Sequence, residues 1–542
     1  MMKRSFLKIL LCSFFLTSLL VTYAQRPMEK LDRSVVAHKV PQGVYVNWRI
    51  TADEYKGTSY RLYRDGTLIH ETGTEGASNF TDPAGTTGSV YTVTAVKNGT
   101  ESAHSQPGRM LTTGFLEIPL RDLKALGKSG YFPNDATAAD LDGDGAMEVI
   151  VKRVNAGWGI ENTQYSFFEA YKLDGTFLWA IDVGPNVNND VEINIAAFDL
   201  DGDGKAEVFM RTAEGTIFGD GKKIGDTNND GITNYRGTAS PQGYMNDGPE
   251  FLSLIDGATG AELDRVDFIP RGRSSDWGDD YGHRSNKFFF GAPYLDGLKP
   301  SIFIGRGIYI KTEMRTYDVV NKKLVLRWEF KSGNSGPYFG QGNHNFTIAD
   351  VDGDGRDEIT WGSMCVDDDG KGLYSTQMGH GDAIHVSDFD PYRKGIEVFS
   401  CLENSPVYGT LFRDGATGQI LHHYVLGRDC GRACAGNITD AYKGAEIWGA
   451  GFGYSATNLV QQQHFGVSEN FTIYWDGDLT KELLDHSGFS TGTGVGYGQI
   501  TKFNSYGNIS TLLNANAYSN NYTKGTPNLQ ADIMGDWREE AI

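Results

Sequence analysis

The sequence predicts an all-β fold: an eight-bladed β-propeller that follows a small fibronectin-III-like β-sandwich. Glycine is very frequent, with 69 residues in 542, and aromatic residues make up 12%, a composition typical of many strands joined by tight turns. A unit of strand, acidic turn and strand also recurs eight times between about residue 117 and the end. Most copies lie ~40–60 residues apart, which is the period of a four-stranded propeller blade.

Residues 1–24 have the pattern of a secretory signal peptide. Lys3 and Arg4 precede an apolar stretch, residues 6–21, and the small-residue end TYA closes it at 22–24. A membrane anchor is the alternative, but the stretch is short and no stop-transfer pattern follows. We therefore expect a secreted or periplasmic protein with no membrane span after signal removal.

Four cysteines remain after the expected signal: Cys365, Cys401, Cys430 and Cys434. Disulfides are permitted outside the cytosol, but their connectivity cannot be read from the sequence. The pair Cys430 and Cys434 lacks a second Cys/His pair, so a zinc site is not expected.

Residues 26–113 predict the β-sandwich domain. Its stretches GVYVNWRI, SYRLYRDGTLIHE and SVYTVTAVKNGTES are short alternating strands joined by Gly, Asn and Asp turns. Nothing in this domain has the pattern of a catalytic site.

Three of the repeated turns carry D-x-D-x-D-G with a further acid at position nine. An EF-hand loop needs its glutamate at position twelve and flanking helices, so the β-branched flanks exclude that reading. Alternating carboxylates on a glycine turn supply the hard oxygen ligands that Ca²⁺ needs, and several structural Ca²⁺ ions are expected. The predicted ligands are Asp140, Asp142, Asp144, Glu148, Asp199, Asp201, Asp203, Glu207, Asp350, Asp352, Asp354 and Glu358.

Other copies of the unit are degenerate. One keeps Asp388, Asp390 and Glu397, which are also predicted Ca²⁺ ligands. The remaining copies lie at 291–305, 433–448, 497–513 and 528–542. An insertion holds D-x-N-x-D-G at Asp226, where a further Ca²⁺ ion or a plain turn is possible.

The propeller domain is predicted to span residues 117–542. Its last unit stops at Ile542, two residues beyond the acid Glu540. We expect that this blade is truncated, rather than completed by strands from the N-terminal side.

All first strands of a propeller run in the same direction, so the residues just before them meet at one mouth of the channel. Five to eight positions before the first acid of the units, the chain carries polar and charged residues. Scattered loop residues are the alternative, but a shared register favours a functional rim. The set comprises Asn134, Asp135, Asn194, His344, His380, Asp382, Arg432 and Lys524.

Two subsets of this rim suggest chemistry. A single metal ion could be held by His344, His380, Asp382 and Glu403, of which the last follows the strand pair of the fifth unit. Histidine ligands also suit a transition metal. Arg432 and Lys524 form a cationic pair, and a lysine beside an arginine and a metal has its charged form disfavoured, which makes it a usable base.

The composition and the motifs exclude several classes of protein. A net charge of −20 argues against nucleic acid as a partner, and no serine nucleophile elbow, P-loop or dinucleotide fingerprint occurs. Rim acids such as Asp135 and Asp382 leave a two-carboxylate glycoside hydrolase open, which would give saturated products. A non-catalytic Ca²⁺-dependent adhesion or glycan-binding propeller explains the acidic turns, but not the register-matched Lys, Arg and His.

Several stretches together resemble the rhamnogalacturonan lyases of polysaccharide lyase family 11. They are YFPNDATAADLDGDG, DGPEFLSLIDGATG, DWGDDYGHRSNKFFFGAPYLDG, GQGNHNFTIADVDGDGRDEI, MGHGDAIHVSDFDP and ADIMGDWREE. The resemblance covers essentially everything after the signal. It implies an eight-bladed propeller with a small β-sandwich, several Ca²⁺ ions and the pectic polysaccharide rhamnogalacturonan I as substrate. Family members continue beyond the DWREE motif, which fits the expected truncation.

The resemblance also implies a reaction: β-elimination at the bond from rhamnose to O4 of galacturonate, which leaves a 4,5-unsaturated uronide. By motif, Lys524 would be the base and Arg432 the charge stabiliser, although which of the two is the base stays open. The implied active-site Ca²⁺ ligands are His344, His380, Asp382 and Glu403, and the implied sugar-contacting residues are Asn134, Asp135 and Asn521. Exo-acting members carry an extra loop that blocks the cleft. The stretch 403–413 shows no such insertion, so we expect endo action, by a monomer.

Overall fold

The computed structural model describes residues 30–542, apart from positions 55, 156–161, 188–193, 460, 463–466, 493 and 537. The expected signal, residues 1–24, lies outside the described residues. Within them the chain is almost entirely β, as predicted, and the helical elements are short 3-10 turns. None of these is long and apolar enough to cross a membrane. They are η1 (Ala52–Glu54), η2 (Arg236–Thr238), η3 (Ser274–Trp277), η4 (Arg284–Asn286) and η5 (Tyr522–Lys524).

Two four-stranded sheets in the N-terminal region share one apolar core. Val44 and Val46 from one sheet and Leu62 and Val93 from the other are buried in the same cluster, because alternate residues of each strand point inward. The first sheet consists of β5 (Asn79–Asp82), β2 (Gly43–Asn47), β1 (Val36–Val40) and β8 (Arg109–Leu111), in that order. The second consists of β4 (Thr67–Glu71), β3 (Thr58–Arg64), β6 (Tyr91–Lys97) and β7 (Thr100–Glu101).

Seven four-stranded antiparallel sheets follow, and in each the strands are paired in chain order. The first three are β9 (Tyr131–Ala139), β10 (Glu148–Asn155), β11 (Phe167–Tyr171), β12 (Phe177–Asp182); β13 (Ile195–Phe198), β14 (Glu207–Ala213), β15 (Glu250–Asp256), β16 (Glu262–Asp267); and β17 (Phe288–Gly291), β18 (Ile302–Arg306), β19 (Glu313–Val320), β20 (Lys323–Lys331). The other four are β21 (Phe346–Ala349), β22 (Glu358–Trp361), β23 (Met364–Val366), β24 (Gly372–Ser375); β25 (Ile384–Ser387), β26 (Glu397–Leu402), β27 (Gly409–Asp414), β28 (Ile420–Val425); β29 (Ala433–Gly436), β30 (Glu446–Gly449), β31 (Phe452–Ser455), β32 (Gln461–Gln462); and β33 (Phe471–Ile473), β34 (Glu482–Ser490), β35 (Val495–Ser505), β36 (Asn508–Tyr518).

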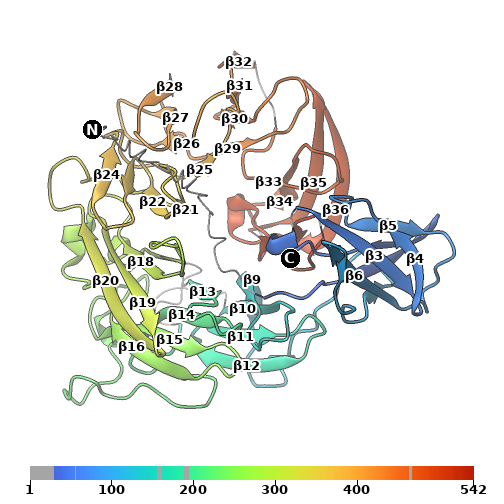
Figure 1. Ribbon diagram of the computed structural model, residues 1–542. Coiled ribbons are helices and arrows are strands. Elements are labelled where there is room, and N and C mark those ends of the chain that lie inside the picture. Colours follow the sequence, from blue (N-terminus) through green and yellow to red (C-terminus); the bar gives the residue numbers. More distant parts are fainter. Residues whose placement is uncertain are drawn as a thin grey trace, which may run out of the picture.

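The seven sheets are arranged in a ring, with their first strands innermost (Figure 1). Strand β9 contacts β13, β13 contacts β17, and β25 contacts both β21 and β29. The loops that precede these first strands therefore come together near the middle of the ring, which is the geometry that the shared register of polar residues requires.

A two-stranded sheet, β37 (Gln530–Ala531) with β38 (Glu540–Ala541), lies between the seventh sheet and the first. The Ala136 amide next to it donates to the Asn528 carbonyl at 2.8 Å, and Gln530 Nε2 donates to the Thr472 carbonyl at 2.7 Å. Asn47 of the N-terminal sheets also donates to Asp536, at 2.9 Å. This small sheet joins both ends of the row of sheets to the N-terminal region.

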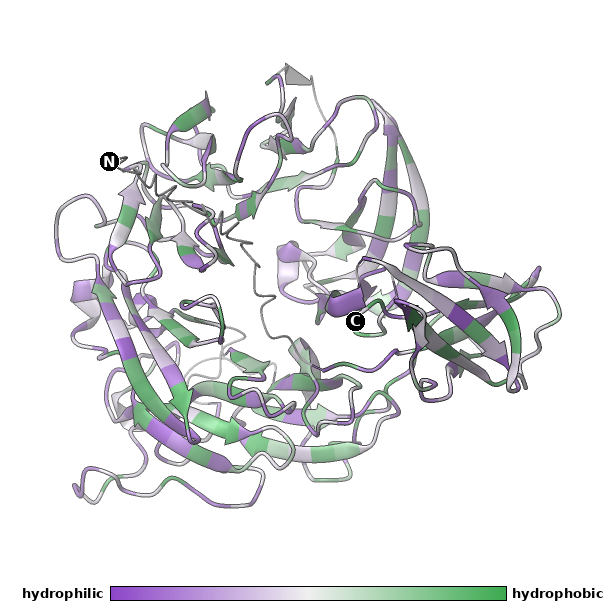
Figure 2. Ribbon diagram, in the orientation of Figure 1, coloured by the Kyte–Doolittle hydropathy of each residue, from purple (hydrophilic) through white to green (hydrophobic). Residues whose placement is uncertain are grey.

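Apolar side chains between neighbouring sheets hold the ring together. Ile150 and Phe168 of the first sheet and Val208 and Met210 of the second are buried in one cluster. Figure 2 shows hydrophobic residues along the strands of the ring. Burial of each large apolar side chain contributes about 1.5–3 kcal/mol, so this packing is the main stabilising contribution.

One repeat was placed wrongly from the sequence. The stretch 497–513 forms the hairpin of β35 and β36, the third and fourth strands of the seventh sheet. The equivalent of the acidic turn lies instead between β33 and β34, where the amides of Trp475 and Asp476 donate to Glu482 at 2.8 and 3.2 Å. Tyr474 stands eight positions before this glutamate, where other copies have their first aspartate, so the D-x-D-x-D pattern is lost.

Candidate active site

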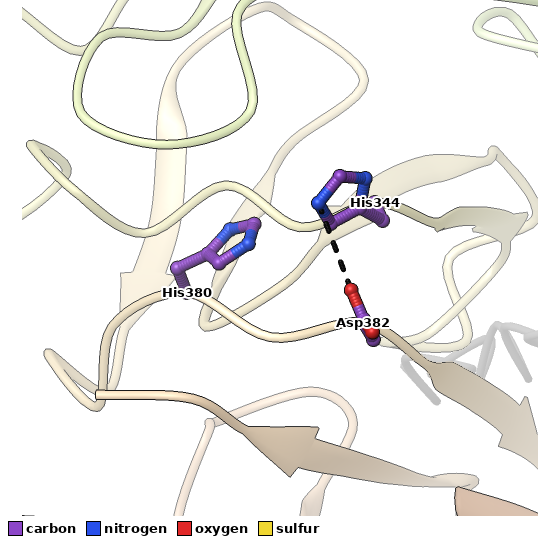
Figure 3. A group of neighbouring side chains, drawn as sticks. All are labelled: His344, His380 and Asp382. Atoms are coloured by element: carbon purple, nitrogen blue, oxygen red, sulfur yellow. Dashed lines mark ion pairs between the residues drawn. The ribbon is translucent and has the colours of Figure 1, made fainter. Parts of the chain in front are cut away.

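The loops before the first strands of the fourth to sixth sheets, together with η5, form the site that we call the rim. Its residues are His344, His380, Asp382, Glu403, Arg432 and Lys524. Asp382 is the point where they meet. Its Oδ1 lies 3.6 Å from His344 Nε2, and its Oδ2 lies 3.7 Å from Arg432 Nη1 and 3.6 Å from Lys524 Nζ. One carboxylate thus faces three side chains that come from other parts of the ring. Figure 3 shows its contact with His344, beside His380.

His380 is oriented by the backbone. Its Nδ1 lies 2.7 Å from the Ile308 carbonyl and 2.9 Å from the Gly342 carbonyl, and because both are acceptors, Nδ1 must carry the proton. Nε2 therefore keeps its lone pair. It is buried without a hydrogen-bond donor among the described residues, and its nearest charged atom is Glu403 Oε2 at 3.4 Å. A histidine that binds a metal ion through one ring nitrogen typically donates a hydrogen bond from the other in this way.

Burial shifts the pKa values of Glu403, His344 and His380 toward their neutral forms. It raises the pKa of Glu403 to about 8, with further contributions from Asp382 and Asp429. It lowers the pKa of His344 to about 3, against the opposing effect of Asp382, and it also lowers the pKa of His380. Two neutral imidazoles and two carboxylates can together bind a cation. The cation would supply the positive charge that balances the carboxylates. His344, His380 and Asp382 have ligand atoms close enough to share one ion.

Tyr309 is a rim residue that the sequence analysis missed. Its hydroxyl lies 2.9 Å from His344 Nε2, and its ring packs at a tilt of 35° against His380, with centroids 4.4 Å apart. It follows the second strand of the third sheet, as Glu403 follows the second strand of the fifth. A search of residues just after second strands would have found it, because they reach the same mouth.

Arg432 is held by side chains of the seventh sheet. Its Nε donates to Asn470 Oδ1 at 3.1 Å, and Asn470 Nδ2 donates to Asp485 Oδ1 at 2.7 Å. Both partners were missed because the seventh unit was placed at 497–513. Asn470 directly precedes β33, as Arg432 directly precedes β29.

The three predicted sugar-contacting residues form one group beside Lys524. Asn521 donates to Asp135 Oδ1 at 2.8 Å and accepts from Asn134 at 3.2 Å. Lys152, which is buried, pairs with Asp135 Oδ2 at 3.0 Å. Asn134 is only 1% exposed, so it supports Asn521 rather than opening to solvent.

The acidic turns lie at the other end of the first strands and share one hydrogen-bond pattern. Asp140 accepts from the amides of Gly143 and Gly145 at 2.7 and 2.9 Å, and Glu148 Oε2 accepts from the Leu141 amide at 2.8 Å. Both glycines have positive φ, 82° and 88°, which the tight turn requires. The turns that start at Asp199 and Asp350 repeat these bonds.

These turns have the donor set of a cation site. Carboxylate oxygens lie close enough to share an ion in the groups Asp140/Asp142/Glu148, Asp199/Asp201/Asp203 and Asp350/Asp352/Glu358. Glu358 Oε1 is buried without a partner among the described residues, and burial raises the pKa of this carboxyl to about 8. Asp367 and Asp368 join Glu358 in a further group. The sequence analysis missed them, although the run VDDDG was a visible signal.

In other turns a side-chain cation lies at the position of the expected ion. Arg393 Nε is 3.4 Å from Glu397 Oε1 in the turn of Asp388 and Asp390. In the seventh sheet Lys502 Nζ lies 2.5–2.9 Å from three carboxylates, those of Asp476, Asp478 and Glu482.

In the first sheet, Lys172 Nζ lies 2.6 Å from both Asp142 and Asp144. This turn carries four acids, Asp140 and Glu148 being the other two, so the lysine neutralises only part of its charge.

Comparison with known proteins identifies relatives over nearly the whole chain. Residues 116–542 match the family model described as "Rhamnogalacturonan lyase family 11, C-terminal domain", and residues 26–111 match "Rhamnogalacturonan I lyases beta-sheet domain". The rhamnogalacturonan endolyase YesW of Bacillus subtilis is 43% identical over 541 residues, 96% of this chain and 83% of the relative. The exolyase YesX of the same organism is 42% identical over 548 residues, 96% of this chain and 87% of the relative.

Solved structures agree with this similarity. The crystal structure of YesW matches with a TM-score of 0.86 at 42% identity and covers 95% of this chain and 88% of that one. The Bacillus licheniformis rhamnogalacturonan lyase matches with a TM-score of 0.85 at 42% identity and the same coverage.

Proposed function

The chain belongs to the family 11 rhamnogalacturonan lyases, and we propose from this membership that it cleaves rhamnogalacturonan I by β-elimination between rhamnose and O4 of galacturonate. It is a polysaccharide lyase whose substrate is pectic rhamnogalacturonan. The observation that supports the catalytic assignment is the convergence of Lys524 and Arg432 on Asp382, beside the two histidines of the rim. A non-catalytic glycan-binding module has no need of this arrangement.

The residues fit the proton transfers that an elimination requires. Lys524, with 49% of its side chain exposed, takes the C5 proton of galacturonate. The C5–H electrons form the C4=C5 double bond, the C4–O4 bond breaks, and the departing oxygen takes a proton from water, whose hydroxide is then neutralised by the proton that Lys524 releases. Negative charge builds on the galacturonate carboxylate as C5 loses its proton, and the Arg432 guanidinium stabilises it. Asp382 holds both cations in place.

We propose Ca²⁺ as the ion at the rim and at the acidic turns of Asp140, Asp199 and Asp350. The turns present only oxygen ligands, which Ca²⁺ prefers, and the rim adds two carboxylates to its two imidazoles. At the rim, a bound Ca²⁺ would attract the galacturonate carboxylate and favour the charge that develops beside it. The protein's part is to hold His380 Nε2, His344, Asp382 and Glu403 around one point.

The ring supports an eight-bladed propeller at residues 117–542, preceded by a fibronectin-III-like sandwich at residues 26–113. Seven four-stranded sheets supply seven blades, and β37 with β38 occupies the eighth position. Sheets that place their first strands around a common axis are typical of this architecture.

Endo action, secretion and a monomeric state complete the proposal. The connection between β26 and β27 spans only residues 403–408, so no insertion obstructs the rim beside Glu403. Identity does not decide between the modes, because the endolyase and the exolyase are almost equally similar. The signal-like pattern of residues 1–24 supports secretion or a periplasmic location.

The decisive assay incubates the protein with rhamnogalacturonan I and Ca²⁺ and follows the ultraviolet absorbance of the new double bond. Endo action predicts a rapid fall in polymer size before small products accumulate. Homogalacturonan should not be cut, because a charged uronate would replace rhamnose and leave polar groups of the channel unpaired. Saturated products, or equal rates on both polymers, would refute the assignment.

A further inference from the structure

Two buried cysteines lie directly behind the rim. Cys401 is in β26, two residues before Glu403, and Cys430 is two residues before Arg432. Their exposed fractions are 0% and 2%, and both belong to the apolar cluster between the fifth and sixth sheets. One thiol therefore lies on the strand that leads to Glu403. The other lies in the loop that leads to Arg432.

The two thiols face each other. Their side chains are within hydrogen-bonding reach, and the strands that carry or follow them, β26 and β29, are in contact. Cys401 Sγ accepts from the Ala383 amide at 3.2 Å, and Cys430 Sγ donates to the Arg432 carbonyl at 3.4 Å. Both sulfur atoms are thus fixed by backbone groups that directly adjoin or belong to rim residues.

The other cysteines of the described chain face elsewhere. Cys434 packs with Trp448 and Leu483, toward the seventh sheet, although it is close to Cys430 in sequence. Cys365 lies in a cluster of the fourth sheet, 3.4 Å from the Thr360 hydroxyl. The geometry therefore selects one pairing that the sequence alone left open.

We propose that Cys401 and Cys430 form a disulfide that ties the strand of Glu403 to the loop of Arg432. The oxidant is an external disulfide, either a dithiol oxidase of the export compartment or a small-molecule disulfide. The Cys430 thiolate attacks one of its sulfur atoms and releases one thiol. The Cys401 thiolate then displaces the second thiol. The chain loses two protons and two electrons, and the external disulfide is reduced to two thiols.

The bond forms during folding, before the fifth and sixth sheets close over it. In the folded chain both sulfur atoms are buried, which keeps an external oxidant away from them. Secretion, as proposed above, would supply the oxidising conditions. The pairing itself can be tested apart from both secretion and lyase activity, because a defined oxidant replaces the compartment.

The first test maps the thiols of the full chain after folding with a mixture of oxidised and reduced glutathione. The protein is alkylated in denaturant without reductant, digested and analysed by mass spectrometry. We expect alkylated Cys365 and Cys434 and one cross-linked peptide that contains Cys401 and Cys430. Alkylation of all four cysteines, or a cross-link that involves Cys434, would overturn the proposal. This result depends on no variant.

The second test separates the bond from the mere presence of cysteine. Because the bond is buried, the protein is reduced in denaturant and refolded with reductant; this refolded wild type should melt several degrees below the oxidised protein, because its unfolded chain lacks a cross-link. Reduction should also raise, a few-fold, the Ca²⁺ concentration for half-maximal activity, because Glu403 is held less firmly. Cys401→Ala should make both properties insensitive to reductant, whereas the matched control Cys434→Ala should keep the wild-type response. An oxidised wild type that does not respond to reduction would contradict the proposed role.

Discussion

The two ends of the first strands hold carboxylates in very different surroundings. In the turn of Asp350, the aspartate accepts hydrogen bonds from backbone amides of its own loop. The same hydrogen bonds recur in several sheets. At the rim, Asp382 faces side chains from other parts of the ring, His344, Arg432 and Lys524, and no two sheets contribute the same set. Repetition thus marks the end to which we assign stabilisation of the fold, and divergence at a shared register marks the end where we propose the chemistry.

Loss of the two cationic side chains of the rim, Lys524 and Arg432, should have the largest effect. Lys524→Ala and Arg432→Ala are each expected to lower kcat by ~10²–10⁴-fold, because a base or a charge stabiliser is lost. Tm should stay near the wild-type value, since both side chains are partly exposed, at 49% and 29%. Initial rates from product absorbance and a thermal melt test the two parts.

Lys524→Arg is the control for the identity of the base. A guanidinium keeps the charge but stays protonated at any working pH. The variant should be nearly as inactive as the alanine. Wild-type turnover would assign Lys524 to binding and move the base to Arg432 or another rim residue.

Chelation should affect both the rim and the acidic turns. Single substitutions should separate the two effects. Excess chelator is expected to abolish activity and to lower Tm by several degrees, because clustered carboxylates then repel each other. His380→Ala should reproduce the loss of activity with a small change in Tm. Glu358→Gln should lower Tm and its response to Ca²⁺ while kcat is kept. A wild-type Tm that is unchanged in chelator, with metal analysis showing no retained ion, would contradict a structural role.

The turn of the seventh sheet offers a sharper comparison, because the cation there is the side chain of Lys502. Lys502→Met should leave the carboxylates of Asp476, Asp478 and Glu482 without a counter-charge and destabilise the fold by about 1–3 kcal/mol. The loss should be the same with and without chelator. Chemical denaturation of wild type and variant in both buffers measures it, and a loss that Ca²⁺ fully restores would show that this turn binds an ion as well.

The pH dependence of the chelated protein should report on the acidic turns. Burial raises the folded-state pKa of Glu358 to about 8 and those of Glu148 and Glu207 to about 7, whereas all three are near 4.5 when unfolded. The folded state then binds more protons, so stability falls as pH rises from about 4.5 to 8. We expect the loss of stability to continue across this whole window. Melts from pH 5 to 8 should show Tm falling in chelator and a larger rescue by Ca²⁺ at the upper end.

Local patterns in the sequence were sufficient to predict the strands and the acidic turns. The D-x-D-x-D-G spacing, with its glutamate at position nine, specifies both the turn and the bond from Glu148 to the Leu141 amide. The rim could be predicted as a set, because residues at one register of a repeat share one end of the ring. Tyr309 and Asn470 lay outside that set, because Tyr309 follows a second strand and Asn470 belongs to the unit that was misplaced. The pairing of Cys401 with Cys430 could not be predicted, because it depends on two neighbouring sheets.

The fixed proton on His380 Nδ1 has a consequence for preparing the protein. Neutral imidazole nitrogens bind Ni²⁺ and Zn²⁺ much more readily than the all-oxygen turns do. If the rim and the turns bind Ca²⁺ as proposed, purification on immobilised nickel would replace the ion at the rim while the turns keep theirs. Such a sample would melt like the native protein and yet fail to turn over substrate. Stripping with chelator and reloading with Ca²⁺ should come before any variant is judged inactive.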